Sequence, residues 1–292
     1  MSGQSLPFSD LSFACAAMVA TASPQIVEVQ SHHSLASGFF WRDGLIVTPD
    51  ETLAEDGKIE VELCDGSVLE AALVGRDPAT DIALLRVGAT NAKVARFGPD
   101  AVRPGELTLI VAAAESTPLV AFGVISASGP AWQSMRGGMI GARIEMDIQL
   151  RYRAQGGLAF DGRGRCFGMA VRGPRRRTLI IPAETIDRIA GQLAEHGRVP
   201  IAYLGATLKD VPLNAGGSGA MVMTLDFGGP AAAGGLHQGD IILSWAGRRM
   251  PHSGALLRAL RATPVGSQVM LGLQRSGSPL ELGVAIGDRP AK

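Results

Sequence analysis

Short apolar or alternating runs, separated by turn residues, fill the first two thirds of this 292-residue chain. Runs such as GLIVT, KIEVEL, IALLRV and ELTLIVAA are separated by turn signals such as RDG, CDGS and RDPATD. Strands at such short, regular spacing are typical of an antiparallel barrel or sandwich. We therefore expect a mainly β fold in this part of the chain.

Two predicted helices flank these runs. Residues 183–197 place apolar side chains at helical spacing and end in His196-Gly197, which is typical of a helix and its C-terminal stop. The apolar run 11–22 predicts a second helix, which begins at a cap formed by Ser9 or Asp10 and packs on the domain. We expect the helix at 183–197 to close the first domain.

The pattern changes after residue 197. The runs YLGATLKDV, GAMVMTLDF, DIILSW and QVMLGLQR predict strands, whereas GPAAAGGL and SGALLRALRAT predict helices. Strands and helices mixed in this way indicate a separate compact unit. We predict two domains, residues 1–197 and residues 198–292.

The charge balance argues against several classes of partner. The chain has 27 Lys and Arg against 27 Asp and Glu, so no net charge attracts nucleic acid or an anionic membrane. The basic run RGPRRR at 172–177 is typical of a solvated loop. The apolar run 11–22 is too short to span a bilayer. We expect no nucleic-acid partner and no membrane span.

Cysteine and histidine positions give no sign of a metal or cofactor site. The cysteines at positions 15, 64 and 166 are odd in number and lack metal-ligand spacing, which favours a reducing compartment over a disulfide framework. His32 and His33 are adjacent but have no spaced third ligand. No Lys or Arg precedes Arg42, so the run 11–22 lacks the basic flank of a signal peptide. We predict a cytoplasmic protein without a metal or cofactor.

The second unit resembles a PDZ domain of the type found in the HtrA/Deg family of serine proteases. The resemblance rests on YLGA at 203–206, on GGPAAAGGLHQGDIILSWAGRRM and on LLRALRATPVGSQVMLGLQRSG, and it covers most of 198–287. It implies a groove that captures the C-termini of peptides or proteins. Amides of the glycine-containing loop would bind the terminal carboxylate, and the strand after it would pair with the peptide.

The residues implied in peptide binding lie on this loop and strand and on one helix. Ser253 and Leu257 would flank the groove, while Leu256 and Leu260, on another face of the same helix, would contact the core. The apolar Leu257 and the small Ala206 favour an apolar C-terminal residue. The implied set is Tyr203, Leu204, Gly205, Ala206, Thr207, Leu208, Ser253 and Leu257. The alternative is a PDZ domain that packs only against its own protease domain.

The first domain resembles the HtrA protease domain over residues 20–197. The segments VELCDGSVLEAALVGRDPATDIALLRV, DGRGRCFGMAV and LIIPAETI carry this resemblance. It implies a chymotrypsin-like double β-barrel, followed here by a C-terminal PDZ domain.

The catalytic triad of that family is only partly kept. Where the family has its histidine base, the segment TPDET places Glu51, or Asp50 or Thr52 if the match slips by one residue. Asp81 stands at the position of the acid, and Gln155 replaces the nucleophilic serine in the segment RAQGGL. The hydroxyl and the imidazole of the triad are therefore both replaced.

These replacements bear directly on the reaction. Serine-protease chemistry needs a hydroxyl nucleophile, an imidazole base and a carboxylate that orients the base. Arg153 also replaces a glycine next to the backbone N–H groups that bind the oxyanion. Asp81 is then expected to be structural, as the acceptor of a backbone N–H in a turn. We predict a pseudoprotease that is not an enzyme.

The resulting hypothesis is a peptide- or protein-binding scaffold, adaptor or assembly factor. Two alternatives remain open, namely a hydrolase of altered chemistry that uses Glu51 and Asp81 as a carboxylate pair, and a regulatory subunit of an active homologous protease. The family resemblance also implies a homotrimer through the N-terminal segment. Phe8 and Phe13 would be its contacts or, alternatively, core residues of their own chain.

Overall fold

A computed structural model describes residues 7–88, 90, 92–98, 102–213 and 216–290 of the chain. The chain divides into two compact units, Met1–Val199 and Pro200–Lys292. The boundary predicted from the sequence, between residues 197 and 198, lies at the end of the helix that closes the first unit.

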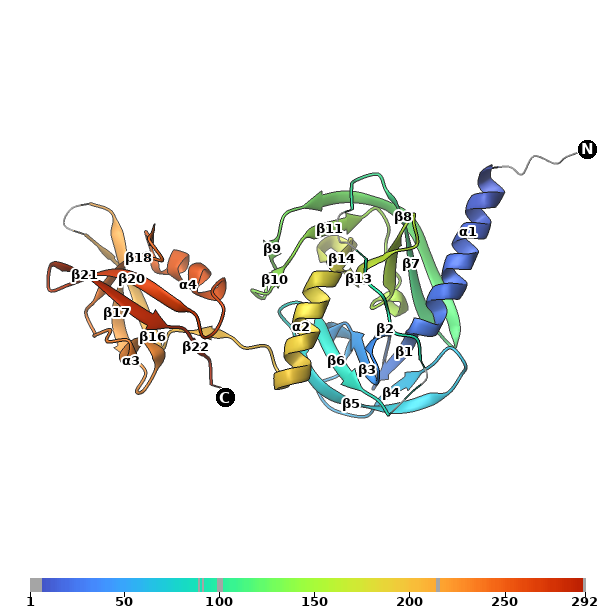
Figure 1. The fold of residues 1–292 in the computed structure, drawn as a ribbon, viewed down its shortest axis with the longest axis horizontal. Coiled ribbons are helices and arrows are strands. Elements are labelled where there is room, and N and C mark those ends of the chain that lie inside the picture. Colours follow the sequence, from blue (N-terminus) through green and yellow to red (C-terminus); the bar gives the residue numbers. More distant parts are fainter. Residues whose placement is uncertain (1–6, 89, 91, 99–101, 214–215, 291–292) are drawn as a thin grey trace, which may run out of the picture. The chain divides into compact units, whose positions relative to one another are not determined.

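Two closed antiparallel barrels make up most of the first unit (Figure 1). The first has the strand order β1-β2-β3-β6-β5-β4. Its strands are β1 (Ile26–Ser31), β2 (Ser34–Arg42), β3 (Leu45–Thr48), β4 (Ile59–Glu62), β5 (Val68–Asp77) and β6 (Ile82–Arg86). This barrel includes the two positions, 51 and 81, that correspond to the base and the acid of a protease.

The second barrel has the order β11-β14-β13-β12-β7-β8. Its strands are β7 (Leu107–Ala114), β8 (Thr117–Gly129), β11 (Arg143–Met146), β12 (Leu158–Asp161), β13 (Cys166–Arg172) and β14 (Thr178–Pro182). A short hairpin, β9 (Trp132–Gln133) and β10 (Met139–Ile140), connects β8 to β11. The two barrels confirm the predicted double β-barrel.

Apolar side chains explain why these strands close into barrels. In β4, the side chains at 59 and 61 are buried and alternate with half-buried Glu60 and Glu62, as expected for a strand with one face on a core. Each barrel has its own apolar cluster. A third cluster joins the two barrels to the closing helix and includes Phe39, Leu84, Leu158, Met169 and Ile189. The site described below lies where the barrels meet.

The closing helix α2 (Ala183–His196) confirms the helix predicted at 183–197. Its apolar stripe is buried, with Ile186 and Leu193 at 0% exposure. The helix ends because Gly197 adopts a left-handed conformation (φ 70°) and donates its N–H to the carbonyl of Leu193. It contacts β5, β6, β13 and β14, so it packs against both barrels.

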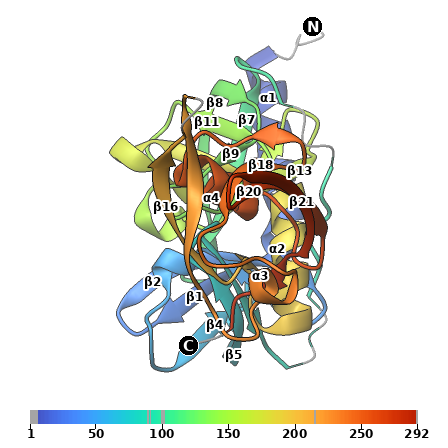
Figure 2. The same ribbon diagram turned by 90° about the vertical axis from the view of Figure 1, so that its left-hand side faces the viewer.

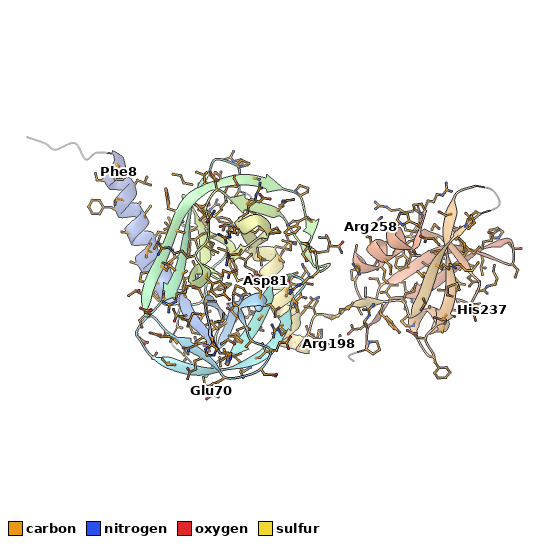
Figure 3. The ribbon with its side chains drawn as sticks, turned by 180° about the vertical axis from the view of Figure 1, so that it is seen from behind. Phe8, Glu70, Asp81, Arg198, His237 and Arg258 are labelled. Carbon is orange, nitrogen blue, oxygen red and sulfur yellow. The ribbon has the colours of Figure 1, made fainter. Side chains whose placement is uncertain are left out.

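The N-terminal helix α1 (Pro7–Ala22) begins earlier than predicted. Ser9 and Asp10 lie inside its first turn, so the prediction that one of them forms the cap is wrong. Proline at the start of the helix explains the shift, because its fixed φ suits the first helical position. Only the C-terminal end of α1 packs on the barrels. Phe8 and Phe13 are 79% and 75% exposed, so the alternative that they are core residues is wrong. Figure 3 shows Phe8 on the part of α1 that extends from the barrels.

The second unit is a sheet with the order β16-β17-β18-β20-β21 and two helices (Figure 2). The sheet strands are β16 (Ala206–Pro212), β17 (Ser218–Leu225), β18 (Ile241–Trp245), β20 (Gln268–Arg275) and β21 (Ser278–Ala285), with β19 (Arg248–Arg249) paired to β18. The remaining elements are β15 (Ala202–Tyr203), β22 (Gly287–Asp288), α3 (Pro230–Ala233) and α4 (Ser253–Arg261). Because β16 is the first strand in the order, one of its edges is not covered by another strand.

Candidate functional site

The turn that carries Gln155 is built by two glycines. It consists of a 3-10 turn (Tyr152–Ala154) followed by Gln155, Gly156 and Gly157, and it leads into β12. Gly156 has φ 88°, and a Cβ there would lie 1.8 Å from the carbonyl oxygen of Ser37. Only glycine permits both this conformation and this close approach to β2.

Ser37 fixes this turn to the rest of the unit. Its N–H donates to the carbonyl of Gln155 at 2.7 Å, and its hydroxyl lies 2.8 Å from the carbonyl oxygen of Arg153. The same hydroxyl oxygen accepts the N–H of Ala113 in β7. Sequence analysis missed Ser37, although a polar residue inside the apolar run LASGFFW is the kind of signal that marks a buried hydrogen-bonding centre.

Gln155 is fully buried at the position of the nucleophile. Its Oε1 accepts the N–H of Arg172 at 3.3 Å, while its Nε2 has no hydrogen-bond partner among the described residues. Its backbone N–H, the equivalent of an oxyanion-binding group, donates to the carbonyl of Tyr152 at 3.1 Å. The turn therefore presents a carboxamide rather than a hydroxyl, and this amide N–H is already engaged.

Arg153, which replaces a family glycine, points away from this position. Its guanidinium forms an ion pair with Glu115 at 2.7 Å and lies close enough to Glu28 and Glu62 for their charges to affect its pKa. Burial raises the pKa of the Glu28 carboxyl, although the N–H of Glu115 and the charge of Arg153 act in the opposite direction. Arg153 thus attaches the Gln155 turn to Glu115, in the turn between β7 and β8 of the second barrel, and lies within the field of two acidic side chains of the first barrel.

The carboxylates predicted from the triad positions lie together. The backbone N–H of Glu51 donates to Oδ1 of Asp81 at 2.8 Å, so Asp81 accepts an N–H as expected. Burial raises the pKa of Asp81 to about 7, and the charges of Glu51 and Asp50 act in the same direction. The Glu51 N–H partly opposes this shift. Asp81 therefore titrates near neutral pH.

Of the three residues that could match the family's base, only Glu51 is exposed. Asp50 is 2% exposed and forms an ion pair with Arg76, whose Nε lies 2.5 Å from Oδ1 of Asp50. Thr52 is also buried, and its hydroxyl donates to the carbonyl of Pro49. Arg76 also donates to the carbonyl of Leu53, so it holds the segment that presents Glu51. Sequence analysis did not identify this role of Arg76.

A cavity of about 210 Å³ lies beside these carboxylates. Its lining includes Glu51, Asp81, Trp132, Met135, Arg136 and Arg172. None of the chain's five histidines, all of which the structure describes, is part of this lining. The cavity therefore combines the carboxyls of Glu51 and Asp81, which is labelled in Figure 3, with apolar side chains and an arginine from the β9–β10 hairpin.

The β9–β10 hairpin rests on the turn that precedes Asp81. Ser134 donates its hydroxyl to the carbonyl of Ala79 at 2.5 Å, and a Cβ at Gly138 would lie only 2.4 Å from the same oxygen. On the other side, Arg188 of α2 donates to the carbonyl of Met139. The hairpin is thus attached both to the turn before Asp81 and to α2.

The second unit contains the loop expected to bind a carboxylate. Gly205 has φ 73°; its carbonyl accepts the N–H of Asp226, and the carbonyl of Leu204 accepts the N–H of Ala231. In a trans peptide the N–H points opposite to the carbonyl. The amides of Gly205 and Ala206 therefore point away from Asp226 and Ala231, towards the open side of the loop.

The structure assigns different environments to the other predicted groove residues. The side chain of Leu204 is 2% exposed and belongs to the core, and Leu208 packs partly against the core. The hydroxyl of Tyr203 bonds to Asp226. Thr207 is exposed. Tyr203, Leu204 and Leu208 therefore support the loop and strand.

Helix α4 presents its predicted faces. Leu256 and Leu260 are 0% and 6% exposed, whereas Leu257 is 45% exposed. The N–H of Ser253, the first residue of α4, donates to Oδ1 of Asp210 in β16 at 2.5 Å. The helix therefore lies beside the open strand β16, and Leu257 is available to a ligand.

Comparisons with known proteins agree with both units. The trypsin-like peptidase domain family matches residues 36–169, and the PDZ domain family matches residues 202–286. A Pseudomonas fulva protein named "Probable periplasmic serine endoprotease DegP-like" is 32% identical over 278 residues, which is 88% of this chain and 57% of that protein. The solved HtrA-type protease AlgW with a tripeptide is 26% identical, with a TM-score of 0.70, and covers 95% of this chain and 98% of that one.

The chain belongs to the HtrA family. The serine endoprotease of Yersinia pestis has the same fold, with a TM-score of 0.72 at 24% identity over 94% of this chain and 98% of that one. A DegP-like relative from Halomonas elongata is 30% identical over 89% of this chain and 58% of that protein. The chain thus spans less than two thirds of the length of the DegP-like relatives from Pseudomonas fulva and Halomonas elongata. The predicted fold, two barrels and a PDZ domain, is confirmed.

These HtrA relatives contradict the prediction that the chain is not an enzyme. They are named serine endoproteases, which points to protease activity. The prediction equated loss of the hydroxyl and the imidazole with loss of all hydrolysis. A cleft that contains a carboxyl titrating near neutral pH retains another acid–base group.

The prediction of a cytoplasmic location is also wrong, because the DegP-like relatives are named periplasmic. The prediction relied on an apolar N-terminal run without a basic flank and on three cysteines, none of which forms a disulfide within the described residues. Buried Cys166 serves as a small apolar side chain and does not report on the compartment. Within the described residues, no helix is long and apolar enough to cross a membrane.

Proposed function

We propose that this HtrA-family protein binds the C-termini of peptides or proteins in its PDZ groove and acts as a scaffold, adaptor or assembly factor. The observation that carries this proposal is the loop at 204–206, whose outward amides stand at the start of the open strand β16. Outward backbone N–H groups bind a terminal carboxylate, and an open strand edge pairs with an extended peptide. AlgW, a solved relative, has been solved with a tripeptide and with a decapeptide.

The side chains around this loop favour an apolar last residue. Ala206 leaves room beside the amides, and the exposed Leu257 offers an apolar contact across the groove. The names of the relatives make the periplasm the compartment in which we propose that the protein acts. We also propose a homotrimer through α1, supported by the exposed aromatic rings of Phe8 and Phe13.

Leu257→Glu in the full chain tests the groove. Peptides with an apolar last residue and a free carboxylate should bind about tenfold or more weakly to this variant, because a charged group would then face an apolar side chain. Binding would be measured by fluorescence anisotropy. Leu280→Glu is the matched control, since Leu280 is 38% exposed on β21, at the opposite edge of the sheet. Equal binding of amidated peptides, or equal affinity of both variants, would refute the proposed groove.

The raised pKa of Asp81 favours a second candidate, a hydrolase of altered chemistry. In this scheme, Glu51 takes a proton from a water molecule whose oxygen attacks the peptide carbonyl carbon. Protonated Asp81 gives its proton to the departing amide nitrogen as the C–N bond breaks. Solvent then returns a proton from Glu51 to Asp81. Both carboxyls line the cavity of about 210 Å³ described above.

Cleavage of an unfolded protein substrate by purified variants tests this candidate. Asp81→Asn and Glu51→Gln should each lower the rate by about a hundredfold or more, because each removes one proton-transfer group. The wild-type rate should fall as the pH rises through about 7, where Asp81 loses its proton. Glu55→Gln, an exposed neighbour, is the control. Cleavage that survives both substitutions would rule out the carboxylate pair.

A further inference from the structure

The open strand β16 carries two adjacent, opposite charges, Lys209 and Asp210. Both side chains are exposed, and neither forms an ion pair within the described part of the chain. Successive side chains of a strand point to opposite faces, so these two charges lie on opposite faces of β16. A peptide paired with this edge would meet one charge on each face.

The groove fixes which peptide residue meets which charge. If the terminal carboxylate is bound by the amides of Gly205 and Ala206, the last peptide residue lies beside Ala206. In an antiparallel pair each step along β16 is one step back along the peptide. The third residue before the last then lies opposite Lys209, and the fourth before the last lies opposite Asp210.

Asp210 is also held in place. Its Oδ1 accepts the N–H of Ser253 at 2.5 Å, which directs the carboxylate towards α4. This hydrogen bond and one to the Ser253 side chain lower the pKa of Asp210, and the nearby His252 acts in the same direction. The carboxylate is therefore ionised at neutral pH and is positioned before a ligand arrives. Helix α4 carries a further charged side chain, Arg258, which directly follows Leu257 (Figure 3).

We propose that the PDZ groove selects C-termini with an acidic residue third before the last and a basic residue fourth before the last. Opposite charges directly across a strand pair stabilise it, and like charges destabilise it. The two pairs act on opposite faces, so their effects should add. This inference rests on the proposed peptide-binding function and adds a sequence preference to it.

Two peptides of identical composition test the proposal on the full chain. One ends in Lys-Glu-Ala-Ser-Val and the other in Glu-Lys-Ala-Ser-Val, so they share net charge, length and last residue. At low salt, the first should bind about tenfold more tightly, because it makes two favourable pairs and the second makes two unfavourable ones. The difference should shrink as salt screens exposed charges.

Variants assign the preference to the two residues. Exchanging the charges, Lys209→Asp with Asp210→Lys, should reverse the order of the two affinities. Asp210→Asn retains an acceptor for the Ser253 N–H and should reduce the difference between the two affinities without reversing it. This single variant tests the proposal even if the double variant does not fold. Glu281→Gln, on the far strand β21, should leave both affinities unchanged.

The outcomes separate this inference from the function on which it rests. Binding that depends on a free carboxylate but does not distinguish the two peptides would overturn the charge preference and leave the groove intact. The charge preference would also be overturned if the charge-exchanged variant bound the two peptides in the same order of affinity as the wild type. Failure of both peptides to bind would overturn the proposed function and, with it, this inference.

Discussion

Replacing Gly156 by alanine is expected to lower the free energy of unfolding of the first unit by about 3 to 5 kcal/mol. The new Cβ would lie 1.8 Å from the carbonyl oxygen of Ser37 and 2.8 Å from Cδ of Pro49, and neither neighbour is a flexible side-chain end. The residue would also have to keep a φ of 88°, which alanine disfavours. Urea unfolding followed by tryptophan fluorescence would measure the change, since Trp41 and Trp132 both lie in this unit.

Gly162→Ala provides the matched control. Gly162 lies in the turn between β12 and β13, and a Cβ there would meet no atom within 4 Å. The Gly162→Ala protein should unfold at a urea concentration close to the wild-type midpoint. A Gly156→Ala protein as stable as the Gly162→Ala protein would show that the turn does not need the close approach to Ser37.

Asp81 is expected to make the stability of the first unit depend on pH. The pKa of this carboxyl is about 7 in the folded chain and about 3.9 in an unfolded chain. A raised folded pKa means that the folded state holds the proton more tightly. The stabilisation is complete below about pH 4 and is lost as the pH rises through about 7. The shift corresponds to about 4 kcal/mol.

Asp81→Asn isolates this contribution. Asparagine retains an oxygen that can accept the N–H of Glu51, but it has no charge to bury. The difference between the two free energies of unfolding, variant minus wild type, should therefore rise by about 4 kcal/mol between pH 4 and pH 8, because only the wild type loses stability over this range. Denaturant unfolding of both proteins at several pH values measures it. Parallel stability profiles would show that Asp81 is not desolvated enough to titrate near neutral pH.

Much of the fold follows from local patterns in the sequence. Alternation in strands such as β4, and the helical stripe of α2 with its terminal glycine, depend only on which side chains face water, so neighbouring residues suffice to predict them. The start of α1 was predicted less well, because Pro7, Ser9 and Asp10 are all acceptable near a helix start. The segments RAQGGL and YLGA also allowed both candidate sites to be located from the sequence. Their glycines mark turns whose backbone conformation other residues disfavour.

The chemistry of the sites was decided by tertiary structure. Ser37 is more than a hundred residues away from Gln155 in the sequence, yet their backbones are joined by a hydrogen bond of 2.7 Å. The pKa of Asp81 depends on its burial and on Glu51, which belongs to another segment of the first barrel. By itself, the sequence determined which residues occupy positions 51, 81 and 155 and where the strands and turns fall. Only the packing of distant segments decided which groups are desolvated, which hydrogen bonds remain to be made and which edge is open, because these properties depend on neighbours in space.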